Sequence, residues 1–167
     1  FCLILFLSME SSASAQQQKP EIYIIGTMHQ VPKIVQNSYR PLLRNAIKYA
    51  PQAIFVENPM AEDTVSWGYL KNGWSSSYKQ FYLLSDSAKR NYNFDEKQHE
   101  RLLSLETRLL SEADISTLIQ GFIYLRDFAN YDYYRYIKRY GTNGSKKALG
   151  HEDDLSFKLA LQLGMKK

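Results

Sequence analysis

The chain has 167 residues, of which 44% are hydrophobic and 23% are charged, and this composition excludes a disordered chain, a collagen-like fibre and a disulfide-knotted miniprotein. The formal net charge of +4 would favour nucleic-acid binding if the basic residues clustered, but they are spread along the sequence. The run Tyr131–Tyr140 interleaves Tyr with Arg and Lys, which is typical of a helix that packs its rings inward, although it could also stack bases. We therefore expect one globular domain with no nucleic-acid partner.

Residues 1–15 have the form of a secretory signal peptide. Phe1–Leu7 is apolar but too short to span a bilayer, which takes about 20 residues, and Ala13-Ser14-Ala15 matches a small-residue cleavage site. The sequence therefore predicts a partial signal peptide, a mature chain over 16–167, export to the periplasm or the cell exterior, and no stable transmembrane anchor. A start at Met9 is the alternative, and it would leave a cytoplasmic protein.

The next residues predict a strand, a helix and a second strand. Ile22-Tyr23-Ile24-Ile25 is short and apolar, which is typical of a strand buried on both faces. Residues 36–49 carry apolar side chains at helical spacing, and Pro51 ends that helix. Ala53-Ile54-Phe55-Val56 is the second apolar run. The sequence thus predicts an α/β fold with a parallel βαβ core.

The pattern becomes helical over 60–140, where we expect a large helical insert or cap. Asp95 with Gln98 three residues later forms an expected capping box, and Ser111 precedes a second amphipathic helix. Residues 69–87 are less regular, and the sequence leaves open whether they contain loop. Both clear helices are expected to face a core.

Residues 141–145 form a break rich in Gly, and a last helix is expected at 153–163, with Gly164 as its cap. In an α/β chain such a helix returns to the sheet. We therefore expect a third strand after Lys167, so that 16–167 is a single domain that is incomplete at its C-terminus.

Polar side chains follow both predicted strands. His29 comes three residues after Gly26, and Glu57 directly follows the second apolar run. Because ligands bind beyond the carboxyl ends of parallel strands, we expect His29 and Glu57 to meet there. Imidazole and carboxylate groups are ligands for a divalent metal ion and equally an acid–base pair. A His that only hydrogen-bonds its loop and a Glu that caps a turn are the alternatives.

Gly26-Thr27-Met28-His29, followed by Ile54-Phe55-Val56-Glu57, resembles the opening of the TraB/PrgY, GumN and Tiki superfamily. Residues 152–164 are similar to a helix in a secreted bacterial branch of that group. The resemblance implies a metal-dependent hydrolase-like α/β fold in which this His and this Glu form the site. A second G-x-x-H, which the superfamily leads one to expect, has no match, since Gly150-His151 does not fit it.

These observations predict a metal-dependent hydrolase of peptide, ester or related acyl bonds. His29 and Glu57 are the expected catalytic and metal-binding residues, a divalent ion is the expected cofactor, and a small molecule or peptide is the expected substrate. A non-catalytic exported binding or regulatory protein of the same fold is the alternative. Cys2 is the only cysteine, so we expect no thiol chemistry in the mature chain.

Other acidic and histidine pairs are weaker candidates. Glu62-Asp63 could approach the site or begin a helix, His99-Glu100 is expected on a solvated helix face, and His151-Glu152 is expected to cap a helix. The sequence has no G-x-S-x-G, no phosphate loop and no G-x-G-x-x-G. This excludes the usual α/β serine hydrolase, an NTPase and a dinucleotide enzyme.

Overall fold

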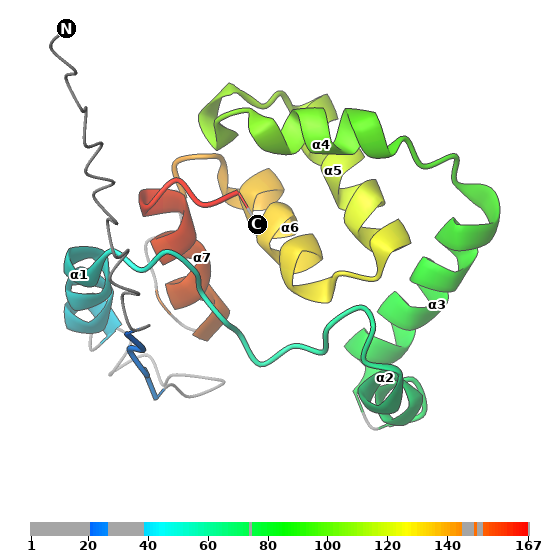
Figure 1. The fold of residues 1–167 in the computed structure, drawn as a ribbon, viewed down its shortest axis with the longest axis horizontal. Coiled ribbons are helices and arrows are strands. Elements are labelled where there is room, and N and C mark those ends of the chain that lie inside the picture. Colours follow the sequence, from blue (N-terminus) through cyan, green and yellow to red (C-terminus); the bar gives the residue numbers. More distant parts are fainter. Residues whose placement is uncertain (1–20, 27–38, 74, 145–148, 150–151, 167) are drawn as a thin grey trace, which may run out of the picture.

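The computed structural model describes residues 21–26, 39–73, 75–144, 149 and 152–166 (Figure 1). No strand occurs among them, so the predicted α/β fold with its parallel βαβ core is wrong, and this part of the chain is all-helical. Its elements in chain order are α1 (Tyr39–Tyr49), α2 (Thr64–Leu70), α3 (Ser76–Asn91), α4 (Glu96–Ser104), the 3-10 helix η2 (Thr107–Leu109), α5 (Glu112–Leu125), α6 (Phe128–Tyr140) and α7 (Glu152–Gln162).

The two apolar runs that predicted strands are irregular segments with largely exposed side chains. Ile22, Ile24 and Phe55 expose 80%, 87% and 95% of their surface. Ile25 and Ile54 instead pack against a cluster that α1 and α7 form. A short apolar run cannot be assigned from its periodicity alone, and here the two runs add single side chains to a helical cluster rather than forming a sheet.

The larger hydrophobic cluster lies among the helices from α2 to α6. The predicted insert or cap over 60–140 therefore carries the main core of the described fold rather than covering a sheet. Helix α5 is central, since it packs against α3, α4 and α6. Its apolar side chains face several directions, which suits a helix surrounded by others. The most deeply buried large side chains of the cluster are Trp67, Leu102, Leu118, Phe122, Tyr134 and Ile137.

Helix α7 joins this larger cluster to the smaller one beside α1. Leu155 and Leu159 are buried in the smaller cluster, as expected for one face of the predicted last helix. Phe157 lies on another face and contacts the rings of Tyr133 and Tyr136, with centroids 5.7 Å and 5.4 Å away. Because α7 is apolar on two faces, it connects α1 to α6 (Figure 1).

Helix ends follow the capping chemistry that the sequence predicts. The Asp95 carboxylate accepts a hydrogen bond from the Gln98 N–H at 2.9 Å. Ser111 and Asp114 form a reciprocal capping box at the start of α5. Gly164, with φ of 68°, ends α7 in the left-handed region that favours glycine. The three expected helix ends are confirmed, and of the capping box expected at α4 the structure shows the half in which the Asp95 side chain accepts from Gln98.

The Tyr-rich helix α6 packs as predicted. Tyr133, Tyr134 and Tyr136 are buried, while Arg135 and Lys138 are exposed. Long basic side chains stay in water while the aromatic rings supply apolar area to the core. The helical interpretation of this aromatic and basic run is therefore confirmed.

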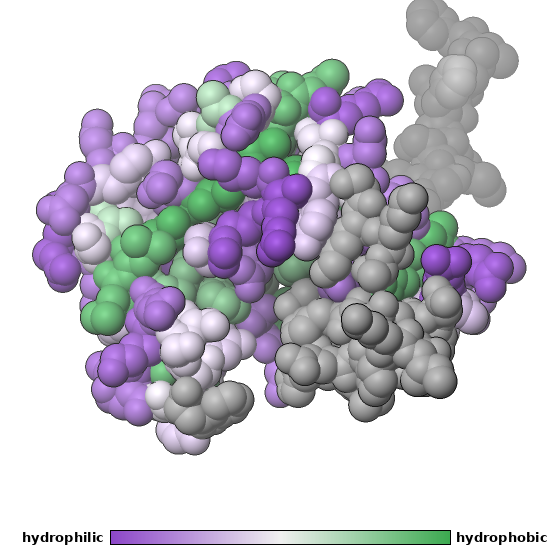
Figure 2. Space-filling model, turned by 180° about the vertical axis from the view of Figure 1, so that it is seen from behind, coloured by the Kyte–Doolittle hydropathy of each residue, from purple (hydrophilic) through white to green (hydrophobic). Residues whose placement is uncertain are grey.

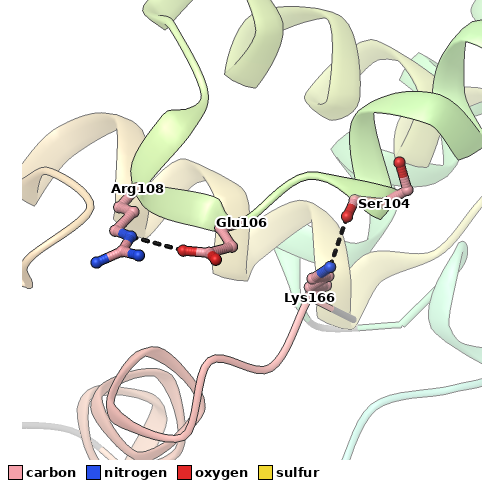
Figure 3. A network of polar contacts seen from close by, with 4 residues as sticks. All are labelled: Ser104, Glu106, Arg108 and Lys166. Atoms are coloured by element: carbon pink, nitrogen blue, oxygen red, sulfur yellow. Dashed lines mark hydrogen bonds and ion pairs between the residues drawn. The ribbon is translucent and has the colours of Figure 1, made fainter.

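Hydrogen bonds connect the segment after α7 to α6 and to the end of α4. Tyr134 Oη donates to the carbonyl oxygen of Lys166 at 2.8 Å, and Lys166 Nζ donates to the carbonyl oxygen of Ser104 at 2.7 Å (Figure 3). The nearby Arg108–Glu106 ion pair is 74% and 58% exposed, so it contributes little to stability. Contacts to α6 and to the end of α4 thus fix the course of the chain beyond α7.

The surface combines charged residues with scattered apolar ones. Seen from behind, hydrophilic residues cover much of the described surface, and a band of hydrophobic residues runs across it (Figure 2). Within the residues that the structure describes, no helix combines the length and the apolar character needed to cross a bilayer.

Candidate functional site

The structure places one of the two predicted site residues. Glu57 is exposed on the irregular segment between α1 and α2, whereas His29 lies outside the described residues. The segments that precede these two residues lie against the same cluster of α1 and α7, because Ile25 and Ile54 both pack there. The meeting of Glu57 and His29 stays a prediction.

Side-chain contacts anchor the segment that carries Glu57. Trp67 Nε1 of α2 donates to the carbonyl oxygen of Met60 at 3.0 Å. Tyr78 Oη of α3 donates to Asn58 Oδ1 at 2.8 Å, and the Tyr78 ring lies 4.8 Å from that of Phe128 in α6. Although this segment has no regular secondary structure, side chains of α2 and α3 therefore hold it, and the α3 side chain in turn contacts α6.

A hollow of about 340 Å³ lies between this segment and the start of α6. Glu57 is not among the lining residues, although its neighbours Val56 and Asn58 both line the hollow. Most of its lining residues are apolar, and the acidic residues Glu62 and Asp127 line it from two different elements. The described lining residues are Ile54, Phe55, Val56, Asn58, Pro59, Met60, Ala61, Glu62, Asp127 and Ala129.

The acidic residues near the hollow differ in their surroundings. Asp127 is the N-cap of α6, and its carboxylate accepts from the Asn130 N–H at 3.0 Å and from Asn130 Nδ2 at 2.7 Å. Asp63 caps α2, where hydrogen bonds from the Ser66 side chain and backbone lower the pKa of its carboxyl group. Glu62 is exposed and lines the hollow. Of the pair Glu62-Asp63, the second residue thus begins a helix and the first faces the candidate site.

The predicted metal site is only partly covered by the structure. Glu57 offers an exposed carboxylate, which is a suitable ligand for a divalent cation. Among the described residues, no group of three or more His, Cys, Asp and Glu side chains could hold a metal ion. The pair of His29 and Glu57 as metal ligands therefore stays a prediction.

The other histidine candidates are also resolved in part. His99 is only 5% exposed and lies against Phe94 and Phe122, with ring centroids 5.4 Å and 4.8 Å away, so the predicted solvated face is wrong. Its neighbour Glu100 is exposed as expected. His151 lies outside the described residues, and the residue after it begins α7.

Sequence analysis missed the part of the hollow that α6 provides. An Asp before an apolar helix signals an N-cap, and Asp127 shows that signal. Nothing in the sequence places this residue opposite Glu62, because they are far apart along the chain. The packing of Tyr78 on Phe128 links the two walls.

Comparisons of the chain with protein-family models, with curated proteins and with solved structures find no match. Function therefore has to follow from the residues themselves and their arrangement.

Proposed function

We propose that the protein is a metal-dependent hydrolase of peptide, ester or related acyl bonds, with His29 and Glu57 in its catalytic and metal-binding site. The observation that carries the proposal is the position of Glu57, an exposed carboxylate on an anchored segment whose other residues line a hollow. The common packing of Ile25 and Ile54 on one cluster supports it, because these residues precede His29 and Glu57 by only a few positions.

A divalent cation at this site would lower the pKa of a bound water to about 7 and so supply a hydroxide near neutral pH. Glu57 would bind the cation or accept the proton of the attacking water. The apolar wall of the hollow would bind the neighbouring part of the substrate and exclude water from it. A small molecule or a peptide fits this division of roles.

The second candidate is a non-catalytic binding or regulatory protein. The observation that favours it is the hollow itself, since apolar walls with a few polar groups are typical of ligand sites whether or not chemistry follows. In that case Glu57 would contact the ligand without a reaction.

Metal analysis and activity assays separate the two candidates. Purified full-length protein is analysed for bound metal and tested on general peptidase and esterase substrates, alongside His29→Ala and Glu57→Ala. Glu100→Ala, at an exposed position of α4, is the matched control. We expect a loss of at least about 100-fold in each site variant, together with loss of metal from at least one of them, and no change in the control.

Equal activity in all four proteins would refute the proposed site. An inactive wild-type protein that binds no metal would leave the binding protein as the better interpretation. Circular dichroism of each variant shows whether a loss reflects misfolding.

The site is further proposed to work outside the cytoplasm, because residues 1–15 have the form of a signal peptide. N-terminal sequencing of the exported protein should begin at Gln16. Protein that remains in the cytoplasm with residues 10–15 attached would support a start at Met9 instead.

A further inference from the structure

We infer that the hollow beside Glu57 binds a basic side chain, Lys or Arg, of a peptide substrate. This inference rests on the proposed function, because it names the substrate class of the same site. Its basis is a hollow whose lining combines apolar residues with two acidic residues from separate elements, on the segment that also carries Glu57.

The shape of the hollow suits an amphipathic side chain. Its volume of about 340 Å³ is ample for one extended side chain. Lys and Arg carry an aliphatic stem below a charged head, and such stems pack along apolar surface. Val56, Pro59 and Met60 supply that surface on one wall.

The charge of the hollow suits a cation. Glu62 lines it from the segment before α2, and Asp127 lines it from the start of α6. None of the described residues that line it is Lys or Arg. Asp127 is oriented by its two hydrogen bonds from Asn130, so its carboxylate does not need to be ordered when a ligand binds.

The nearest basic residue along the chain is directed elsewhere. Arg126 precedes Asp127 directly, but its guanidinium group pairs with Asp86, donates to Ser85 Oγ at 3.2 Å and lies 4.1 Å from the ring centroid of Tyr82. Arg126 makes these contacts with α3 from a left-handed backbone conformation, with φ of 61°. The positive charge beside Asp127 is thus engaged by α3 rather than by the acidic groups of the hollow.

The two walls of the hollow are joined through one side chain. Tyr78 hydrogen-bonds to Asn58 on the first wall, and its ring contacts Phe128, which lies between the lining residues Asp127 and Ala129 on the second. A basic side chain bound between these walls would bring the adjoining peptide backbone close to the segment that carries Glu57.

Peptide binding to the full-length protein tests the inference without requiring turnover. The probe is a fluorescein-labelled hexapeptide of alanines with one central Lys, compared by fluorescence anisotropy with the same peptide carrying norleucine. Wild-type protein should bind the Lys peptide about tenfold more tightly, because each of two partly exposed ion pairs contributes a factor of about two to five. Added salt should reduce that preference.

Two variants remove the charges while retaining the fold. Glu62→Gln alters an exposed side chain, and Asp127→Asn keeps an N-cap residue of equal quality at the start of α6. The double variant should bind both peptides equally. Glu100→Gln, on the exposed face of α4, is the matched control and should retain the wild-type preference.

A third variant tests whether binding requires the volume of the hollow. Ala129→Leu fills the hollow and should weaken binding of both peptides about tenfold, since it removes the contact surface of the stem. Ala113→Leu, at an exposed position of α5, is its control and should change neither affinity.

Equal binding of the two peptides by wild-type protein, or a Lys preference that survives in the double variant, would overturn the inference. Its failure is distinguishable from failure of the proposed function. A Lys preference lost in the double variant, in a protein that hydrolyses nothing, supports the basic-side-chain site and refutes the hydrolase. Hydrolysis that depends on Glu57 but shows no preference for basic peptides refutes this inference alone.

Discussion

Replacement of Gly121 by Ala should destabilise the protein, although Ala normally favours a helix. Gly121 lies in the middle of α5, where the His99 imidazole approaches the backbone. A Cβ atom at Gly121 would lie 2.5 Å from His99 Cε1 and 3.2 Å from His99 Cγ, and it would also contact His99 Nδ1. Ordinary carbon contacts lie at about 3.5–4.0 Å, so the ring or the helix would have to move.

Two opposing effects set the magnitude. Ala stabilises a helix interior by about 0.8–1.0 kcal/mol relative to Gly. Insertion of a methyl group into a packed core costs about 1–3 kcal/mol. His99 is 5% exposed and packs against the rings of Phe94 and Phe122, so it has little room to shift. The steric cost should therefore lie in the upper part of its range, about 2–3 kcal/mol, which leaves a net loss of about 1–2 kcal/mol in the free energy of unfolding.

Urea unfolding followed by circular dichroism measures this loss. Gly68→Ala in α2 is the matched control, because Gly68 is exposed and no atom lies within 4 Å of its added Cβ, and it should stabilise the protein. In the His99→Ala background the ring is gone, so Gly121→Ala should become stabilising as well. The reasoning fails if Gly121→Ala stabilises the wild-type protein as much as Gly68→Ala does.

Three further changes concern buried tyrosines and a cap. Tyr134→Phe removes the hydrogen bond to the carbonyl oxygen of Lys166 and should lower the free energy of unfolding by about 1 kcal/mol. Tyr136→Phe should not lower it, since no described residue hydrogen-bonds the buried Tyr136 hydroxyl. Equal losses of stability in urea unfolding would contradict this. Burial, with a smaller contribution from nearby acidic charge, raises the pKa of Tyr136 from 10.0 to about 12. Its neutral form therefore contributes stability that is present below about pH 10 and lost as pH rises through about 12. Unfolding curves across that range should show a smaller alkaline loss of stability in Tyr136→Phe than in the wild-type protein. An identical loss in both proteins would contradict this explanation. Ser111→Ala breaks the capping box with Asp114 and should cost about 1 kcal/mol, with faster amide exchange in the first turn of α5; unchanged exchange there would contradict it.

Helix positions were predictable because the signals for them are local. Ser111 begins α5 and Asp95 begins α4 by hydrogen bonds that span only three residues. Apolar residues at three- and four-residue spacing then mark the buried face of each helix. Such signals depend on neighbouring residues alone, so a sequence displays them in full.

The predicted strands failed because burial, unlike capping, depends on distant residues. The run from Ile22 to Ile25 has the composition of a buried strand, yet most of its surface is exposed. A strand also needs hydrogen bonds from a neighbouring strand, and nothing in the run itself specifies that partner. For His99 a local signal was present but overlooked. It lies three residues before the buried Leu102, which places both on one face of α4.

The candidate site shows the same division between local and distant determinants. Glu57 was predictable as an exposed acidic residue at the end of an apolar run, but its fixed position depends on Trp67 and Tyr78, which bind the neighbouring backbone and Asn58. Trp67 belongs to the larger hydrophobic cluster, and Tyr78 packs against it. Because a segment without regular structure takes its position from these core aromatic residues, the geometry around Glu57 depends on how that cluster packs. Substitutions in the core can therefore disturb the site while the helices themselves remain intact.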